Sequence, residues 1–231
     1  MPVFWLHPDR IEFPNPNFAD EDGIVAVGGD LSPKRLLLAY RKGLFPWYNE
    51  NEPILWWCLN PRLVLFPKDL YIAKSMRPYF NQQKFKVTFD TQFEQVVRAC
   101  QQNARRGQEN GTWISEAIVE AYVRMHDLGF GHSVEVWQDD ILVGGLYGIS
   151  IGKVFFGESM FANVSNASKV GFITLVQRLT ALGYWLIDCQ QQTQHLSSMG
   201  AQPIPRTMFL KILKKNELEP DKEGSWKSWN S

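Results

Sequence analysis

The chain of 231 residues has little cysteine and no cysteine pair. Its cysteines, Cys58, Cys100 and Cys189, lie too far apart for a CxxC motif, so their spacing predicts no zinc site. The histidines are also scattered and form neither an HxH nor an HExxH motif, so we expect no bound metal. A small, odd number of cysteines is typical of a reducing compartment, and we expect a cytoplasmic protein.

Long apolar runs are missing too. No stretch approaches the roughly 18 residues of a membrane-spanning helix, and the N-terminus lacks the charged-then-apolar pattern of an export signal. We therefore expect no membrane association.

Lys plus Arg number 24 and Asp plus Glu also number 24, so the net charge is zero. This balance argues against a protein that coats nucleic acid through bulk charge, although a local basic patch is compatible with it.

Common catalytic motifs are absent as well. The pair Gly152-Lys153 is no phosphate-binding loop, because Tyr147 replaces the glycine five residues upstream and Val154 replaces Ser or Thr. There is no dinucleotide fingerprint, no GxSxG elbow and, at residues 168–173, no coenzyme A pyrophosphate motif. We expect no cofactor. What remains is direct acyl transfer from an activated donor, which needs positioning, a proton acceptor and stabilisation of an oxyanion.

The chain changes character near residue 62. Before it, the sequence is rich in Pro and Trp and contains one clear helix, which begins after Ser32 and ends at Gly43. After it, helices and strands alternate. We predict an α/β (α+β) protein with a small N-terminal domain, residues 1–62, and an acetyltransferase-like (GNAT-like) mixed-sheet domain, residues 63–231. The last fifteen residues are polar, and we expect them to be mobile.

The segment 144–171 is the centre of the second part. It reads as a β-hairpin followed by a polar loop and a helix, and strand alternation places Val154, Phe156, Glu158 and Met160 on one face. A carboxylate between a phenyl ring and a thioether suits a site better than a surface. An ordinary core hairpin is the alternative interpretation.

A second polar pair follows in the strand 184–190. Alternation places Asp188 and Gln190 on one face, roughly 6.6–7 Å apart, so both can contact one small ligand. Buried polar groups of this kind need hydrogen-bond partners.

Upstream, aromatic residues stand between prolines in residues 45–62, and rigid loops that carry flat rings suit stacking on a nucleic-acid base. Trp47 is the candidate for such stacking.

Nine short blocks of the sequence closely resemble, in the same order, the bacterial leucyl/phenylalanyl-tRNA–protein transferases: FPWY, ILWW-x-x-x-PR, GTWI, EVW, LVGG-x-YG, GESMF, NASK, LIDCQ and HL-x-S-x-GA-x-x-IPR. The resemblance covers roughly residues 12–212. It implies an aminoacyltransferase that moves Leu or Phe, and also Met, from aminoacyl-tRNA to the N-terminal α-amino group of proteins beginning with Arg or Lys. Such proteins are thereby marked for N-degron proteolysis. We expect a monomer.

The resemblance also implies roles for individual residues. Trp47 and Trp113 would hold the terminal adenosine of the tRNA. Glu158, Asp188 and Gln190 would handle the amine and the scissile ester. The aminoacyl pocket would be lined by Leu146, Phe156, Met160 and Ile187. The candidates for contacts with the tRNA backbone are Lys74, Arg77, Lys84, Lys86, Arg105 and Arg106, each of which a solvated basic face would also explain.

The proton transfer has two possible acceptors. Asp188, directly or through Gln190, is one, and the ribose 2′-hydroxyl of the tRNA is the other. An apolar pocket separates side chains that differ by a methylene by only ~1–3 kcal/mol, so we expect a loose choice among Leu, Phe and Met. Two alternative functions stay open: a coenzyme A-dependent N-acetyltransferase, against which the missing pyrophosphate motif counts, and a non-catalytic module that binds tRNA ends or protein N-termini.

Overall fold

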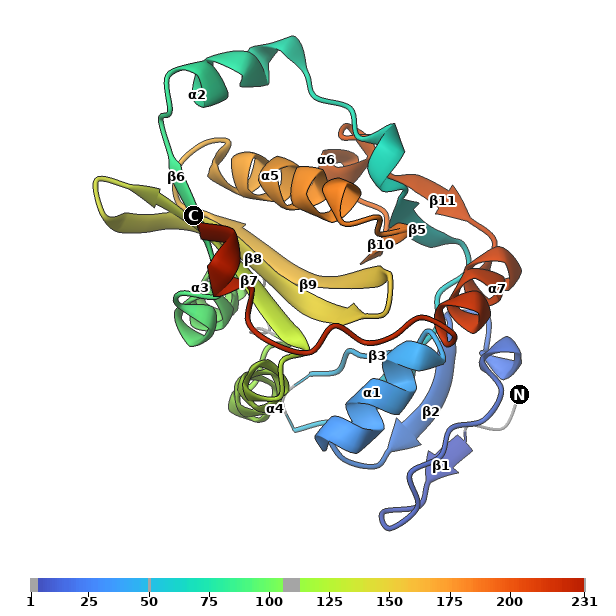
Figure 1. The fold of residues 1–231 in the computed structure, drawn as a ribbon. Helices are drawn as coiled ribbons and strands as arrows, with labels where there is room; N and C mark the ends of the chain where they lie inside the picture. The colour runs from blue at the N-terminus through green and yellow to red at the C-terminus, as the bar shows by residue number, and fades with distance from the viewer. Residues whose placement is uncertain (1–3, 50, 106–112, 231) are drawn as a thin grey trace.

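The first part of the chain forms a small four-stranded sheet. The computed structural model describes residues 4–49, 51–105 and 113–230 (Figure 1). The strands of the small sheet are, in spatial order, β1 (Phe4–Leu6), β2 (Ile24–Gly28), β4 (Leu55–Trp57) and β3 (Phe45–Pro46). A 3-10 turn, η1 (Pro16–Phe18), and helix α1 (Pro33–Arg41) complete this part. The Ser32 hydroxyl accepts a hydrogen bond from the Arg35 N–H, so α1 begins where its cap predicts.

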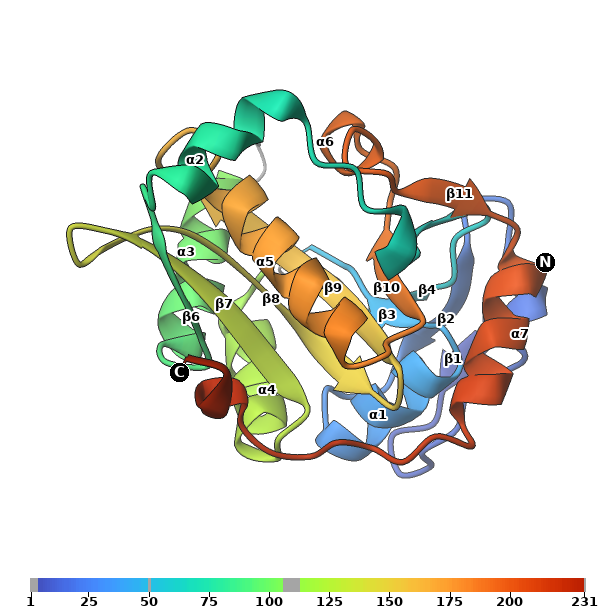
Figure 2. The same cartoon turned by 45° about the horizontal axis from the view of Figure 1, so that its top comes forward.

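The second part forms a seven-stranded mixed sheet. Its strands are, in spatial order, β11 (Gln202–Ile204), β5 (Arg62–Leu65), β10 (Leu186–Gln190), β9 (Val154–Ala162), β8 (Ile141–Ile151), β7 (Gly131–Gln138) and β6 (Lys86–Phe89). The helices are α2 (Arg77–Asn81), α3 (Phe93–Arg105), α4 (Glu116–Asp127), α5 (Ala167–Ala181), α6 (Gln194–Ser197) and α7 (Arg206–Asn216), with short turns η2 (Pro67–Asp69), η3 (Lys74–Met76) and η4 (Trp226–Asn230). Helix α5 crosses one face of the sheet, and α3 and α4 cover the other (Figure 2). The predicted fold class, α/β with a small N-terminal part before a mixed sheet, is confirmed.

One strand pair in this sheet is parallel. Strands β9 and β10 run side by side from the pair Val154–Leu186 to the pair Phe156–Asp188, and α5 is the crossover helix between them. Beyond Asp188 the two strands are no longer paired, although β9 continues to Ala162. They therefore diverge in the middle of the sheet and leave an opening between them.

A β-bulge interrupts the long hairpin at the same level. Tyr147 pairs with Ser159 and Gly148 pairs with Gly157, so Glu158 has no residue opposite it on β8. A Cβ atom at Gly148 would lie 2.2 Å from the carbonyl oxygen of Phe156, which explains the glycine beside the bulge. The extra residue reverses the alternation of side chains along β9. Val154, Phe156 and Glu158 therefore share one face as predicted, but the prediction that Met160 shares it is wrong.

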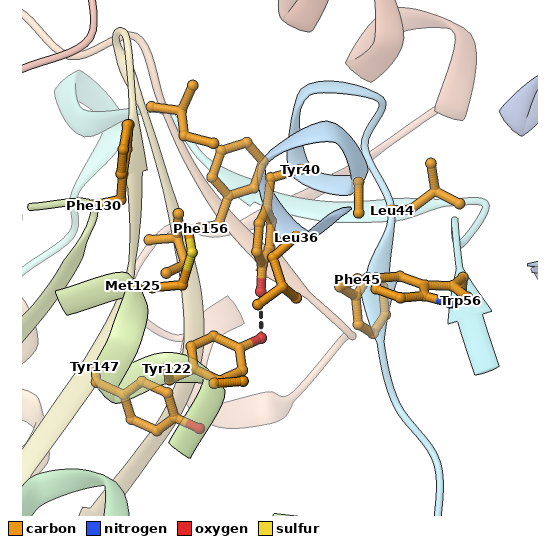
Figure 3. Close-up of a cluster of buried hydrophobic side chains, with 14 of the residues drawn as sticks. Leu36, Tyr40, Leu44, Phe45, Trp56, Tyr122, Met125, Phe130, Tyr147 and Phe156 are labelled. Atoms are coloured by element: carbon orange, nitrogen blue, oxygen red, sulfur yellow. Dashed lines mark hydrogen bonds between the residues drawn. The ribbon is translucent and has the colours of Figure 1, made fainter. Parts of the chain in front are cut away.

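Two clusters of buried side chains form most of the core. The larger lies between the small sheet, α1, α3, α4 and one face of the large sheet, and it contains Phe156 next to Tyr40, with ring centroids 5.1 Å apart (Figure 3). The other lies beneath α5 and includes Phe155. The small sheet ends at Trp57 and the large one starts at Arg62. The domain boundary at residue 62 stays a prediction, because the larger cluster runs through both parts without interruption.

The C-terminal segment packs against the large sheet, contrary to the expected mobile tail. Trp226 is buried and its ring stacks on His132 with centroids 3.7 Å apart, while its backbone N–H donates to Asp90. The side-chain amide of Asn230 donates to the carbonyl of Phe89 and accepts from its N–H, as a neighbouring strand would. Ring stacking and the hydrogen bonds of the Asn230 side chain to the edge strand β6 hold this segment in place. In the described ranges, no helix combines the length and apolarity needed to cross a bilayer.

Candidate active site

A cavity of about 510 Å³ opens where β9 and β10 diverge. Its lining residues come from both faces of the large sheet and from the loop after β3, and we call these two parts of the lining its two compartments. One lies beneath α5 and is apolar. The other lies on the side of α1 and α4 and is aromatic and polar. A single ligand with an apolar end and a flat polar end fits this division.

The apolar compartment contains most of the predicted pocket. It is lined by Leu146, Phe155, Met160, Phe172, Ile187 and Leu196. The structure brings three of the predicted residues, Leu146, Met160 and Ile187, into one wall. The prediction for Phe156 is wrong, because the bulge at Glu158 places the preceding residue, Phe155, in this wall and turns Phe156 to the opposite face. Only the pairing register of β8 and β9 reveals this exchange of Phe155 and Phe156, and the sequence pattern contains no signal for it.

The aromatic compartment contains both predicted tryptophans. Trp47, after β3, and Trp113, before α4, line the cavity and are half-buried. The ring of Trp57 packs 5.3 Å from that of Trp47, and its N–H donates to the Trp47 carbonyl at 2.6 Å. The fully buried Trp56 donates to the Gly28 carbonyl. These contacts hold the Trp47 backbone rigidly and leave part of its ring facing the cavity.

Asp188 forms a fully buried ion pair at the floor of the site. Arg62, the first residue of β5, donates from Nε to Oδ1 at 2.8 Å and from Nη2 to Oδ2 at 2.6 Å. Neither side chain is exposed. Oδ1 also accepts the backbone N–H of Gln190 at 2.9 Å. Both Asp188 oxygens are thus held by the charged Arg62 guanidinium, whereas the partners of Glu158 described below are neutral; the predicted role of Asp188 as the base stays a prediction.

Gln190 is turned toward Glu158 rather than lying beside Asp188 as a second free group. The pairing of β10 with β5 shifts between Asp188 and Gln190, and Gln190 adopts the left-handed conformation, with a φ of 59°. Its side-chain amide then donates to Oε1 of Glu158 at 3.0 Å. The two carboxylates thus have separate partners, as buried polar groups require.

Glu158 is a buried carboxyl surrounded by hydrogen-bond donors. The Tyr122 hydroxyl donates to its Oε2 at 2.7 Å, and the hydroxyls of Tyr122 and Tyr40 form a hydrogen bond (Figure 3). Desolvation raises the pKa of the Glu158 carboxyl from its ordinary value of 4.5 to about 7, although the tyrosine hydrogen bonds act in the opposite direction. A carboxyl that titrates near neutral pH can both accept and return a proton. Sequence reasoning singled out Glu158 but missed Tyr40 and Tyr122, whose helical spacing reads as core.

The basic residues predicted to contact the tRNA backbone lie away from the cavity, where the structure describes them. Lys74, Arg77, Lys84 and Lys86 are exposed around α2 and β6 and do not line the cavity. Arg106 and the side chain of Arg105 lie outside the described residues. Among the residues that the structure describes, no group of three His, Cys, Asp or Glu side chains could hold a metal ion.

Comparison with known proteins identifies relatives over nearly the whole chain. A family model described as leucyl/phenylalanyl-tRNA protein transferase matches residues 64–214, and one for the N-terminal domain of that transferase matches residues 29–60. A leucyl/phenylalanyl-tRNA–protein transferase from Christiangramia forsetii is 56% identical over 213 residues, 91% of this chain and 100% of that protein. One from Myxococcus xanthus is 49% identical over 227 residues, 98% of this chain and 97% of the other. Among solved structures, a GCN5-related N-acetyltransferase from Kribbella flavida gives a TM-score of 0.36 at 12% identity, over 74% of this chain and 60% of that one.

Proposed function

The chain belongs to the leucyl/phenylalanyl-tRNA protein transferase family, and we propose that it moves Leu or Phe from aminoacyl-tRNA to the N-terminal α-amino group of proteins that begin with Arg or Lys. It is an aminoacyltransferase with aminoacyl-tRNA and protein as its substrates. The acceptor preference, the use of Met as a further donor and the marking of products for N-degron proteolysis are parts of the proposal. So are a monomeric state and a cytoplasmic location, to which three free cysteines are suited.

The two compartments of the cavity indicate how the aminoacyl end of the tRNA would bind. The Leu or Phe side chain would enter the apolar compartment beneath α5, and the terminal adenine would stack on Trp47 or Trp113. The ester that joins amino acid and ribose would then lie between the compartments, at the opening beside Glu158 and Gln190. An ester of this kind is already activated, so the transfer requires no nucleotide triphosphate.

Glu158 is the proton acceptor in this proposal. The attacking α-amine has an ordinary pKa of about 7.7–8.0 and loses a proton as its nitrogen bonds to the ester carbon. The Glu158 carboxylate takes that proton, and the proton passes to the ribose 3′-oxygen as the carbon–oxygen bond breaks. The carbonyl oxygen of Gln190 accepts a hydrogen bond from the amine and orients it. The observation that carries this assignment is a buried carboxyl in the cavity wall, with a pKa of about 7 and two fixed donors.

Asp188 has a positioning role in this proposal. Its carboxylate is satisfied by Arg62 and by the N–H of Gln190, so it fixes the turn that presents the Gln190 side chain. The acceptor ammonium is then held by Glu158 and Gln190 rather than by Asp188. This division assigns the two buried carboxyl groups different tasks through their different partners.

The decisive experiment is intact-mass analysis of a reporter protein beginning with Arg, incubated with leucyl-tRNA and pure enzyme. We expect one leucine per reporter without ATP, coenzyme A or added metal. A matched reporter whose N-terminus is acetylated should gain nothing, and acetyl-coenzyme A in place of leucyl-tRNA should leave the mass unchanged. Reporters beginning with Lys or Ala, and phenylalanyl- and methionyl-tRNA, then define the specificity. No mass gain, or gain only with acetyl-coenzyme A, would refute the proposed function.

A further inference from the structure

Arg62 supports the active site from outside the cavity. The residue is fully buried at the start of β5 and is not among the residues that line the cavity. Its guanidinium packs over two aromatic rings, with Cζ 4.6 Å from the centroid of Phe45 on β3 and 4.8 Å from that of Phe209 on α7. Packing against two buried aromatic rings restricts the orientation of a planar cation. It can therefore hold a second group in a fixed position.

That second group is Asp188. A buried ion pair is a weak source of stability, because removing both charges from water offsets most of their attraction. Its two parallel hydrogen bonds, however, fix the plane and the position of the carboxylate. The same Oδ1 atom that Arg62 Nε contacts also accepts the N–H of Gln190. The chain of contacts thus runs from a rigid guanidinium to the backbone of Gln190.

This backbone needs support. Gln190 occupies the left-handed region, with a φ of 59°, which an L-residue with a side chain adopts only when surrounding contacts favour it. In the ordinary extended conformation the strand would continue, and the Gln190 amide would not point toward Glu158. The hydrogen bond from its N–H to Asp188 is the contact that favours the observed turn.

We propose that Arg62 is a positioning residue for aminoacyl transfer, which clamps Asp188 so that Gln190 is held in the turn that directs its side-chain amide to Glu158. The inference rests on the proposed function, because Gln190 and Glu158 are the groups that meet the substrate amine there. Arg62 itself touches no substrate. Because Arg62 does not line the cavity, whereas the residues of the apolar compartment and both tryptophans do, we expect its loss to lower turnover and to leave binding of the donor nearly unchanged.

The test separates positioning from charge neutralisation. Turnover and KM for leucyl-tRNA, together with the thermal midpoint, are measured for Arg62→Met and for Arg62→Met combined with Asp188→Asn. We expect Arg62→Met to lower kcat at least about a hundredfold, the typical effect of a misplaced reacting group, with KM within about threefold. The double variant leaves no unpaired charge at positions 62 and 188, so its midpoint should recover toward that of the wild type while kcat stays low. Recovery of kcat to within about tenfold of the wild type would overturn the proposal, because Arg62 would then only neutralise Asp188.

Arg62→Lys covers the case in which the methionine variant does not fold. Lysine keeps the charge but offers a point donor without the planar fork. We expect it to fold and to lose kcat about tenfold at a nearly constant KM, whereas full turnover would refute the clamp. The control is Arg41→Met with Asp221→Leu, which removes the 2.6 Å ion pair between α1 and the C-terminal segment. If Glu158→Gln keeps full turnover while Arg62→Lys does not, the assigned proton acceptor is wrong and the Arg62 effect still stands.

Discussion

Replacing Glu158 by Gln measures how burial of this carboxyl changes the free energy of unfolding as a function of pH. In the unfolded chain the group ionises with its ordinary pKa of 4.5, and in the folded protein desolvation raises that pKa to about 7. Between these values the native state retains a proton that the unfolded state has lost, so the free energy of unfolding falls as pH rises. The contribution is fully present below pH 4.5 and is lost as pH rises to about 7. At ~1.36 kcal/mol per pKa unit, the whole change is roughly 3 kcal/mol.

Urea unfolding of wild type and Glu158→Gln between pH 5 and pH 8.5 measures this difference. Other titrating groups affect both proteins equally, so the variant should gain roughly 3 kcal/mol, or somewhat less, relative to wild type as pH rises across this range. Over the same range its transfer rate should be at least about a hundredfold below wild type, which is the usual contribution of a general base. The control is Glu217→Gln, whose side chain is exposed and does not line the cavity, and it should keep the wild-type transfer rate. Parallel stability curves for Glu158→Gln and wild type would refute the assigned proton affinity.

Three further predictions concern the neighbouring residues. Ala at Trp47 or Trp113 should weaken use of aminoacyl-tRNA by roughly 1–3 kcal/mol, and Phe much less; a loss of thermal stability at constant KM would instead identify packing residues. Asp188→Asn should lower kcat at least about tenfold with no recovery toward pH 9, because its carboxylate is held by Arg62; recovery at high pH would restore it as the base. Tyr122→Phe removes a hydrogen bond that lowers the pKa of Glu158, so the acidic limb of the kcat/KM profile should move to higher pH; an unchanged limb would exclude this coupling.

The sequence by itself determined the composition of the site. The blocks that resemble the transferases contain Trp47, Trp113, Glu158 and Gln190, and the structure gathers all of these around one cavity. Their local settings were also readable: prolines around the aromatic loop, a hairpin, and a strand that ends in polar residues. Such features depend on residue type and short-range periodicity, which a single sequence records. Their roles in binding and catalysis stay predictions.

Only the tertiary structure decided how these residues are used. Phe155 rather than Phe156 faces the apolar compartment, because one unpaired residue in β9 reverses the alternation. Asp188 is engaged by Arg62, 126 positions away in the chain, an ion pair that the strand pattern did not indicate. Glu158 titrates near neutral pH because elements from across the chain exclude water from it. The register of strand pairing, the ion pair between distant residues and the desolvation of a carboxyl all arise from contacts between remote segments. Such contacts leave no local pattern in the sequence.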